Sequence, residues 1–148
     1  MPEITQATGG SACGKSNAFR RVECQESDRI LISHLLPGEG DRHYLGHFLI
    51  EPKRHIEGLG ELIDAEAEEI GRMTARLSRA LKEGEGAEHV YSFVLGHHVP
   101  HLHIHVIPRY PGAPREYWGM RVNEWPDASR GGKEAIEALC ERVRKKLT

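Results

Sequence analysis

Three histidines alternate with apolar residues in the segment His101-Leu102-His103-Ile104-His105. Side chains two residues apart on a β-strand point to the same face, about 6.6 Å from one to the next. We therefore expect the three imidazoles to share one face, with the aliphatic side chains packed behind them. Such a row spans roughly 13 Å, which suits an extended polyatomic anion better than a single metal ion. A neutral imidazole can attack phosphorus near pH 7 while a neighbouring histidine donates a proton.

Two other interpretations of this segment remain open. A pair such as His101 and His103 could chelate zinc, since a zinc–nitrogen bond is only about 2.0–2.1 Å long, and the chain would then be a zinc-dependent hydrolase. The segment could also be a solvated histidine-rich strand without chemistry. It is internal and alternates strictly with branched aliphatic residues, which distinguishes it from a terminal histidine tag.

The sequence from Arg29 to Arg109 resembles the histidine-triad (HIT) family. The family motif is His-φ-His-φ-His-φ-φ, with φ apolar, and residues 101–107 match every position. A second segment, from Gly46 to Ile56, is similar to the family's strand that ends in Pro-Lys-x-His. The resemblance implies a homodimer of α+β protomers that hydrolyses or transfers nucleoside monophosphate groups.

The resemblance also implies roles for four histidines. His103 would attack the α-phosphorus of a nucleotide and form a covalent nucleotidyl-histidine intermediate that water later cleaves. His105 would contact the phosphate near the bridging atom and assist the leaving group. His101 and His55 would orient and polarise the site. The substrates implied are dinucleoside polyphosphates, nucleotide phosphoramidates or related nucleotide adducts.

Four further residues are candidates for substrate binding. His97 and His98 stand where many relatives carry polar side chains near the phosphate, although they could simply be exposed turn residues. His34 takes the place at which relatives often bind ribose through Asp or Asn, and it could equally be a residue at the edge of the core. Arg109 opens a loop over residues 108–132, whose arginines and aromatic rings could stack on a base or hold phosphates. The alternative for this loop is packing against the C-terminal segment or a dimer interface.

The resemblance requires no metal at the covalent centre, although a polyphosphate substrate could react as its magnesium complex. Some bacterial relatives bind structural zinc through an N-terminal Cys-x-x-Cys. Cys13 and Cys24 lie too far apart to match that motif, so we do not expect this zinc site. Zinc held by one of these cysteines with a histidine is the alternative. A different functional class also stays open, namely a nucleotide-binding or sensing HIT protein with little turnover.

Composition limits the other classes of function. The 148 residues carry a formal net charge of −2, which does not suggest a dedicated nucleic-acid-binding or membrane-surface protein. The first ten residues lack the pattern of a secretory signal, and no apolar run is long enough to span a membrane. The three cysteines are an odd number and widely spaced, which favours a reducing, cytoplasmic setting over a disulfide framework.

The remaining patterns predict the elements that position the histidines. Alternating or continuous apolar runs indicate strands, and apolar residues at helical spacing indicate amphipathic helices. We expect strands at residues 29–36, 47–50, 90–95 and 101–106, and helices at residues 59–81 and 133–147. This order indicates an α+β class, here a HIT-like fold with an antiparallel sheet of about five strands and two main helices.

The N-terminal residues predict no part of the site. Residues 1–17 are small and polar and are expected to form a flexible arm, with a single HIT domain over residues 18–148. Residues 9–16 match the phosphate-loop pattern Gly-x4-Gly-Lys-Ser. That loop works only when a buried strand leads into it, and the eight preceding residues are too few and too polar to form one.

Overall fold

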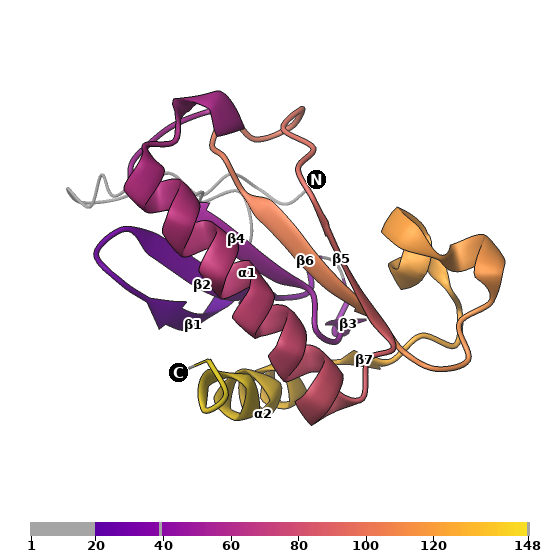
Figure 1. Cartoon of the computed structure of the whole chain (residues 1–148). Coiled ribbons are helices and arrows are strands. Elements are labelled where there is room, and N and C mark those ends of the chain that lie inside the picture. The colour runs from indigo at the N-terminus through magenta and orange to yellow at the C-terminus, as the bar shows by residue number, and fades with distance from the viewer. Residues whose placement is uncertain (1–19, 39, 148) are drawn as a thin grey trace.

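The computed structural model describes residues 20–38 and 40–147, so the expected arm, Cys13 and the phosphate-loop pattern lie outside the described residues. The chain forms a five-stranded antiparallel sheet in the order β1-β2-β4-β6-β5 and a second sheet of two strands, β3 and β7. The large sheet contains β1 (Arg21–Glu26), β2 (Ile30–Leu35), β4 (Phe48–Pro52), β6 (Ile104–Arg109) and β5 (His89–Phe93). The helices are α1 (Asp64–Glu85) and α2 (Lys133–Arg144). This arrangement confirms the predicted α+β class, with five strands and two main helices (Figure 1).

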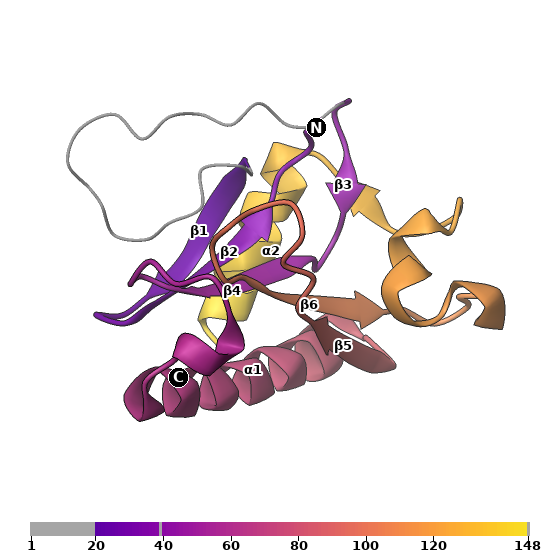
Figure 2. The same ribbon diagram turned by 90° about the horizontal axis from the view of Figure 1, so that it is seen from above.

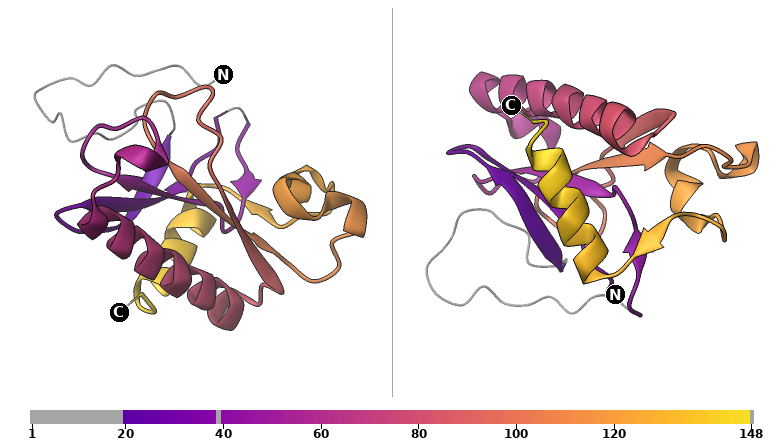
Figure 3. Two further views of the ribbon diagram at one scale, coloured as in Figure 1. Left: turned by 45° about the horizontal axis from the view of Figure 1, so that its top comes forward. Right: turned by 90° about the horizontal axis from the view of Figure 1, so that it is seen from below.

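The core lies between one face of the large sheet and the two helices. In the register of the sheet, Ile32 on β2 pairs with Ile50 on β4, which pairs with Ile104 on β6. These side chains are buried with apolar residues of α1 and α2 in one cluster. Figures 1 and 3 show α1 lying along the sheet and α2 packed beside it. On β4, side chains that alternate with Ile50, such as Leu49, point to the opposite face of the sheet. His47 and His105 lie on that face.

Helix α1 begins at Asp64, later than the predicted start at Leu59. Leu59 and Ile63 fit the helical spacing, but Leu59 begins a separate 3-10 turn, η1 (Leu59–Glu61), and both side chains are 55% exposed. The helix starts where the carboxylate of Glu66 accepts a hydrogen bond from the backbone N–H of Ile63 at 3.0 Å. No helix among the residues described is long and apolar enough to cross a membrane.

Strand β1 was not predicted from the sequence. A β-bulge between Glu23 and Gln25 breaks the two-residue alternation, and only Cys24 of the strand is fully buried. Because β1 forms an edge of the sheet, its remaining residues are polar or only half-buried. Neither hydrophobic runs nor a regular period therefore indicates this strand.

The predicted loop over residues 108–132 is more ordered than expected. It begins inside β6 and contains two 3-10 helices, η2 (Arg115–Tyr117) and η3 (Gly119–Glu124). It ends in β7 (Arg130–Gly131), which pairs with β3 (His43–Tyr44). Figure 2 shows this small sheet standing beside the end of the large one. The segment after the triad therefore supports the chain between β2 and β4.

Candidate active site

The triad histidines lie where the chain enters the middle of the large sheet. His105 lies on β6, whereas His101 and His103 precede its first residue, Ile104. The strand predicted over residues 101–106 is wrong at its start, because the chain bends at His101 and pairs with β4 only from Ile104. All three histidine side chains are buried, and the apolar residues that alternate with them belong to the core. The ring centroids of His103 and His105 are 5.1 Å apart.

A backbone contact fixes the protonation of His103. Its Nδ1 lies 2.8 Å from the carbonyl oxygen of His101. A carbonyl oxygen only accepts hydrogen bonds, so Nδ1 carries the proton and Nε2 carries the lone pair of the neutral ring. Burial lowers the pKa of His103, which favours this neutral form. The local geometry therefore places the lone pair of the neutral His103 ring on Nε2.

His101 is held by the end of β4. Its Nε2 donates to the carbonyl oxygen of Pro52 at 3.0 Å and lies 3.5 Å from Oε1 of Glu51. Glu51 is itself buried and forms an ion pair with Arg21, which reaches across from β1. Burial lowers the pKa of His101 to about 4. His55 is exposed, and its ring stacks on His101 with 5.4 Å between centroids. These contacts fix the backbone whose carbonyl orients His103.

His105 contacts a histidine that was not among the predicted site residues. Nε2 of His47 lies 2.9 Å from Nδ1 of His105, and the ring of Phe93 stacks on His105 with 4.7 Å between centroids. The signal for His47 is the strand register: Leu49 pairs with His105, and the residue two positions earlier shares its face. Burial lowers the pKa of His105 to about 4 and that of His47 well below its usual value.

His34 lies on β2 and is fully buried, with both ring nitrogens bonded to the backbone. Nδ1 donates to the carbonyl oxygen of Leu35 at 2.6 Å, and Nε2 accepts from the N–H of Gly46 at 2.9 Å. These bonds leave neither nitrogen for ribose hydroxyls, so the geometry favours the core-edge alternative for His34. Its bond to Gly46 instead holds the residue that precedes His47.

The other candidate binding residues lie outside this buried group. His97 and His98 are exposed in the connection between β5 and β6, with their ring centroids 4.2 Å apart. Arg109 lies at the far end of β6, where it donates to the hydroxyl of Tyr91 at 2.6 Å. Its guanidinium also lies 3.7 Å from the centre of the Trp118 ring. These contacts favour the packing alternative for Arg109.

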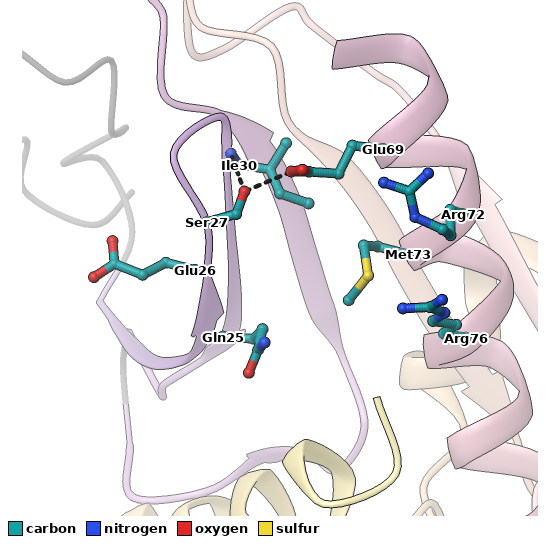
Figure 4. A pocket seen from close by; sticks show the side chains of 8 residues that line it. All are labelled: Gln25, Glu26, Ser27, Ile30, Glu69, Arg72, Met73 and Arg76. Atoms are coloured by element: carbon teal, nitrogen blue, oxygen red, sulfur yellow. Dashed lines mark hydrogen bonds between the residues drawn. The ribbon is translucent and has the colours of Figure 1, made fainter. Parts of the chain in front are cut away.

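No group of three or more metal-binding side chains among residues 20–38 and 40–147 is arranged to hold a metal ion. Cys24 and Cys140 are buried thiols in contact between β1 and α2, with the Sγ of Cys24 donating to the carbonyl oxygen of Cys140 at 3.6 Å. A separate surface pocket lies between the β1–β2 turn and α1, and no histidine lines it (Figure 4). Because α1 covers the opposite face of the sheet, this pocket is not part of the histidine site.

A family model described as HIT domain matches residues 41–112, from just before β3 to just after β6. Over this segment, just under half of the chain, the protein is similar to HIT-domain proteins. An uncharacterized HIT-like protein of Borreliella burgdorferi is 36% identical over 73 residues, which cover 45% of this chain and 52% of that protein. The match therefore spans about half the length of this relative.

Solved structures of HIT proteins share the fold. A histidine triad protein of Sinorhizobium meliloti superposes with a TM-score of 0.66 at 21% identity, covering 85% of this chain and 89% of that one. A hypothetical histidine triad nucleotide-binding protein of Sulfolobus tokodaii gives a TM-score of 0.63 at 21% identity, covering 86% and 84%. The HIT family includes nucleotide-binding proteins and nucleotide hydrolases and transferases. At these identities the structural matches show the fold, and the choice among those activities has to come from the site.

The first prediction concerns Gly46, which directly precedes the buried His47. Gly46 has φ of +99°, and a Cβ added there would lie 2.5 Å from Cγ of Pro108 and 2.8 Å from Oη of Tyr110. We expect Gly46→Ala to lower the free energy of unfolding by about 3 kcal/mol, measured by urea unfolding, because strain and a clash act together.

Gly86→Ala is the matched control. Gly86 ends α1 with φ of +79°, but an added Cβ would meet nothing within 4 Å. The free energy of unfolding of this variant should fall by about 1–2 kcal/mol, which is the cost of placing alanine in a left-handed backbone conformation. Equal losses in the two variants would contradict the close approach of Gly46 to Pro108.

The second prediction concerns the effect of low pH on the stability of a fold with buried histidines. Burial lowers the pKa values of His34, His101 and His105 to about 4, against 6.5 for the unperturbed side chain. Between these values the unfolded chain binds protons at these rings and the folded chain does not. The free energy of unfolding should therefore fall as the pH drops from about 6.5 to about 4, with up to about 1.4 kcal/mol per pH unit from each histidine.

Urea unfolding at several pH values would measure this loss. At about one pH unit or more above 6.5 the three rings are neutral in both states, so their contribution should be flat. Ordinary carboxylates titrate below about pH 4.5, which leaves the upper part of the window to the histidines. A stability that does not change across that part would contradict the burial of neutral imidazoles.

Proposed function

We propose that this protein is a nucleotidyl hydrolase or transferase in which Nε2 of His103 attacks the α-phosphorus of a nucleotide. The observation that carries the proposal is the 2.8 Å contact between Nδ1 of His103 and the carbonyl oxygen of His101. Because that contact keeps the proton on Nδ1, the lone pair of Nε2 is ready for attack without a separate base. The new nitrogen–phosphorus bond replaces the bond from phosphorus to the leaving group.

His105 supplies the proton that the leaving group needs. Its Nδ1 bonds to His47, so a neutral ring that accepts at Nδ1 carries its proton on Nε2. This Nε2–H can pass to a departing alkoxide, phosphate or amine in the first step. In the second step water attacks the nucleotidyl-histidine intermediate, His105 accepts the proton of that water, and His103 is released as a neutral ring.

The remaining predicted residues position the reacting groups. His101 fixes His103 through its backbone, and the exposed ring of His55 stacks on the ring of His101. His97 and His98 stay candidate contacts for the phosphates, because their exposed loop leads directly into the triad. Dinucleoside polyphosphates and nucleotide phosphoramidates are the substrates proposed, with magnesium bound only as part of a polyphosphate substrate.

The proposal includes a homodimer formed through β5. This strand is at an outer edge of the large sheet, and an edge strand presents unpaired backbone groups that another chain can bind. Pairing of β5 with its copy would join two sheets and bring the two histidine sites onto one surface. Sedimentation analysis would test it, and a monomer at micromolar concentration would contradict it.

The third prediction tests the nucleophile. His103→Ala and His103→Gly should each lower kcat by at least about 1,000-fold on diadenosine polyphosphates and adenosine phosphoramidate, because no covalent intermediate can form. Hydrolysis of the phosphoramidate should survive a chelator, since the proposed chemistry uses no resident metal. Circular dichroism and Tm would verify that both variants fold.

Each competing function has its own outcome in this experiment. Loss of phosphoramidate hydrolysis on chelation, with His103 intact, would favour the zinc-dependent hydrolase. Tight nucleotide binding without turnover in the unsubstituted protein would favour the sensing protein. Full activity in His103→Ala would refute the covalent mechanism.

A further inference from the structure

A line of three histidines connects the active site to the surface near the small sheet. Nε2 of His43 lies 3.2 Å from Nδ1 of His47, and Nε2 of His47 lies 2.9 Å from Nδ1 of His105. The rings of His43 and His47 are stacked, with 5.3 Å between centroids. His47 and His105 are buried, whereas His43 is only half-buried. The line therefore runs from an accessible ring to one that adjoins the proposed nucleophile.

Hydrogen-bond chemistry makes the two bonds point in the same direction. Both ring nitrogens of His47 are engaged by other imidazoles, and a neutral ring has only one N–H. His47 must therefore donate one bond and accept the other. In one polarity the proton of His105 is on Nε2, and in the reversed polarity it is on Nδ1. The first polarity makes His105 an acid towards the substrate, and the second makes it a base.

We propose that His43 is the solvent end of a proton relay that restores His105 through His47 during each half of the reaction. The inference rests on the proposed nucleotidyl transfer. When Nε2 of His105 gives its proton to the leaving group, Nδ1 takes one from His47, and His47 takes one from Nε2 of His43. His43 then binds a solvent proton at Nδ1. Hydrolysis of the intermediate runs the same shifts backwards and returns that proton to solvent, so the protons balance.

The surroundings of His43 suit a relay that stays neutral between transfers. His43 lies on β3, whose pairing with β7 places it opposite Gly131. The charge of Arg130 on β7 adds to burial in lowering the pKa of His43, so that a proton is not retained there. His34 on β2 lies 6.2 Å away between ring centroids, but both its nitrogens are bonded to the backbone. The line therefore ends at His43 and does not continue through His34.

His43→Phe separates relay from packing, because phenylalanine keeps a ring that can stack on His47 but carries no proton. His43→Gln is a second test variant, because its amide can still form a hydrogen bond to His47 but cannot relay a proton. Two substrates complete the design. Adenosine phosphoramidate has an amine leaving group that needs a proton, whereas the 4-nitrophenyl ester of AMP releases a phenolate that does not.

We expect His43→Phe and His43→Gln to lower kcat for the phosphoramidate about ten-fold or more and to increase its solvent deuterium isotope effect. The first step with the nitrophenyl ester, measured as the burst of nitrophenolate, should be nearly unchanged. Added imidazole should restore part of the lost kcat. Equal turnover of the phosphoramidate by the variants and the unsubstituted protein would overturn the relay. An equal loss in both measurements with a lowered Tm would also overturn it, in favour of a structural role.

Nitrogen NMR of the histidine rings tests the relay without activity. The unsubstituted protein should show His47 with one protonated and one hydrogen-bond-accepting nitrogen, and His43→Phe should change that pattern at His47 and His105. An unchanged pattern would overturn the relay. An inactive His103→Ala together with an unaffected His43→Phe would leave the proposed function standing and remove the relay alone. Inactivity of the unsubstituted protein would instead remove the proposed function.

Discussion

Burial of imidazole rings is the constraint on which the site depends. Among the described residues, five histidines are buried, namely His34, His47, His101, His103 and His105. A buried ring has to stay neutral or be paired with a charge, and its nitrogens need hydrogen-bond partners. A partner that can only accept, such as a carbonyl oxygen, in turn decides which nitrogen carries the proton. The bond from His103 to the carbonyl oxygen of His101 therefore both satisfies a buried group and leaves the lone pair of the neutral ring on Nε2.

The large sheet makes this arrangement possible because one face packs against the helices and the other carries His47 and His105. Ile50 and Ile104 belong to the face that α1 and α2 cover, and they anchor β4 against β6. With that register fixed, His47 on the other face has to meet His105. A shift of one residue in the register of β6 would turn the side chain of His105 into the helix-packed core. The apolar packing of one face thus sets the hydrogen bonds of the other.

The sequence predicts much of this site because the relevant signals are local. The alternation around His103 and the second motif up to His55 indicate both segments of the HIT domain, and the main helices follow from their apolar spacing. The contacts that involve His47 and His34 could not be predicted in the same way. They depend on the register of β4 with β6 and on the conformation of Gly46, neither of which has a local pattern.

The small sheet is the part of the fold that sequence patterns miss most completely, and it lies beside the site. β3 and β7 are two residues each, too short for any period to indicate a strand. Their pairing joins the segment after the triad, and the start of α2 beyond it, to the chain that leads into His47. Tyr44 on β3 adds to this junction, because its hydroxyl donates to the carbonyl oxygen of Pro108 at 2.6 Å. The position of His43 is thus fixed by residues that follow the triad in sequence, so the region after the triad can influence the histidine cluster from outside it.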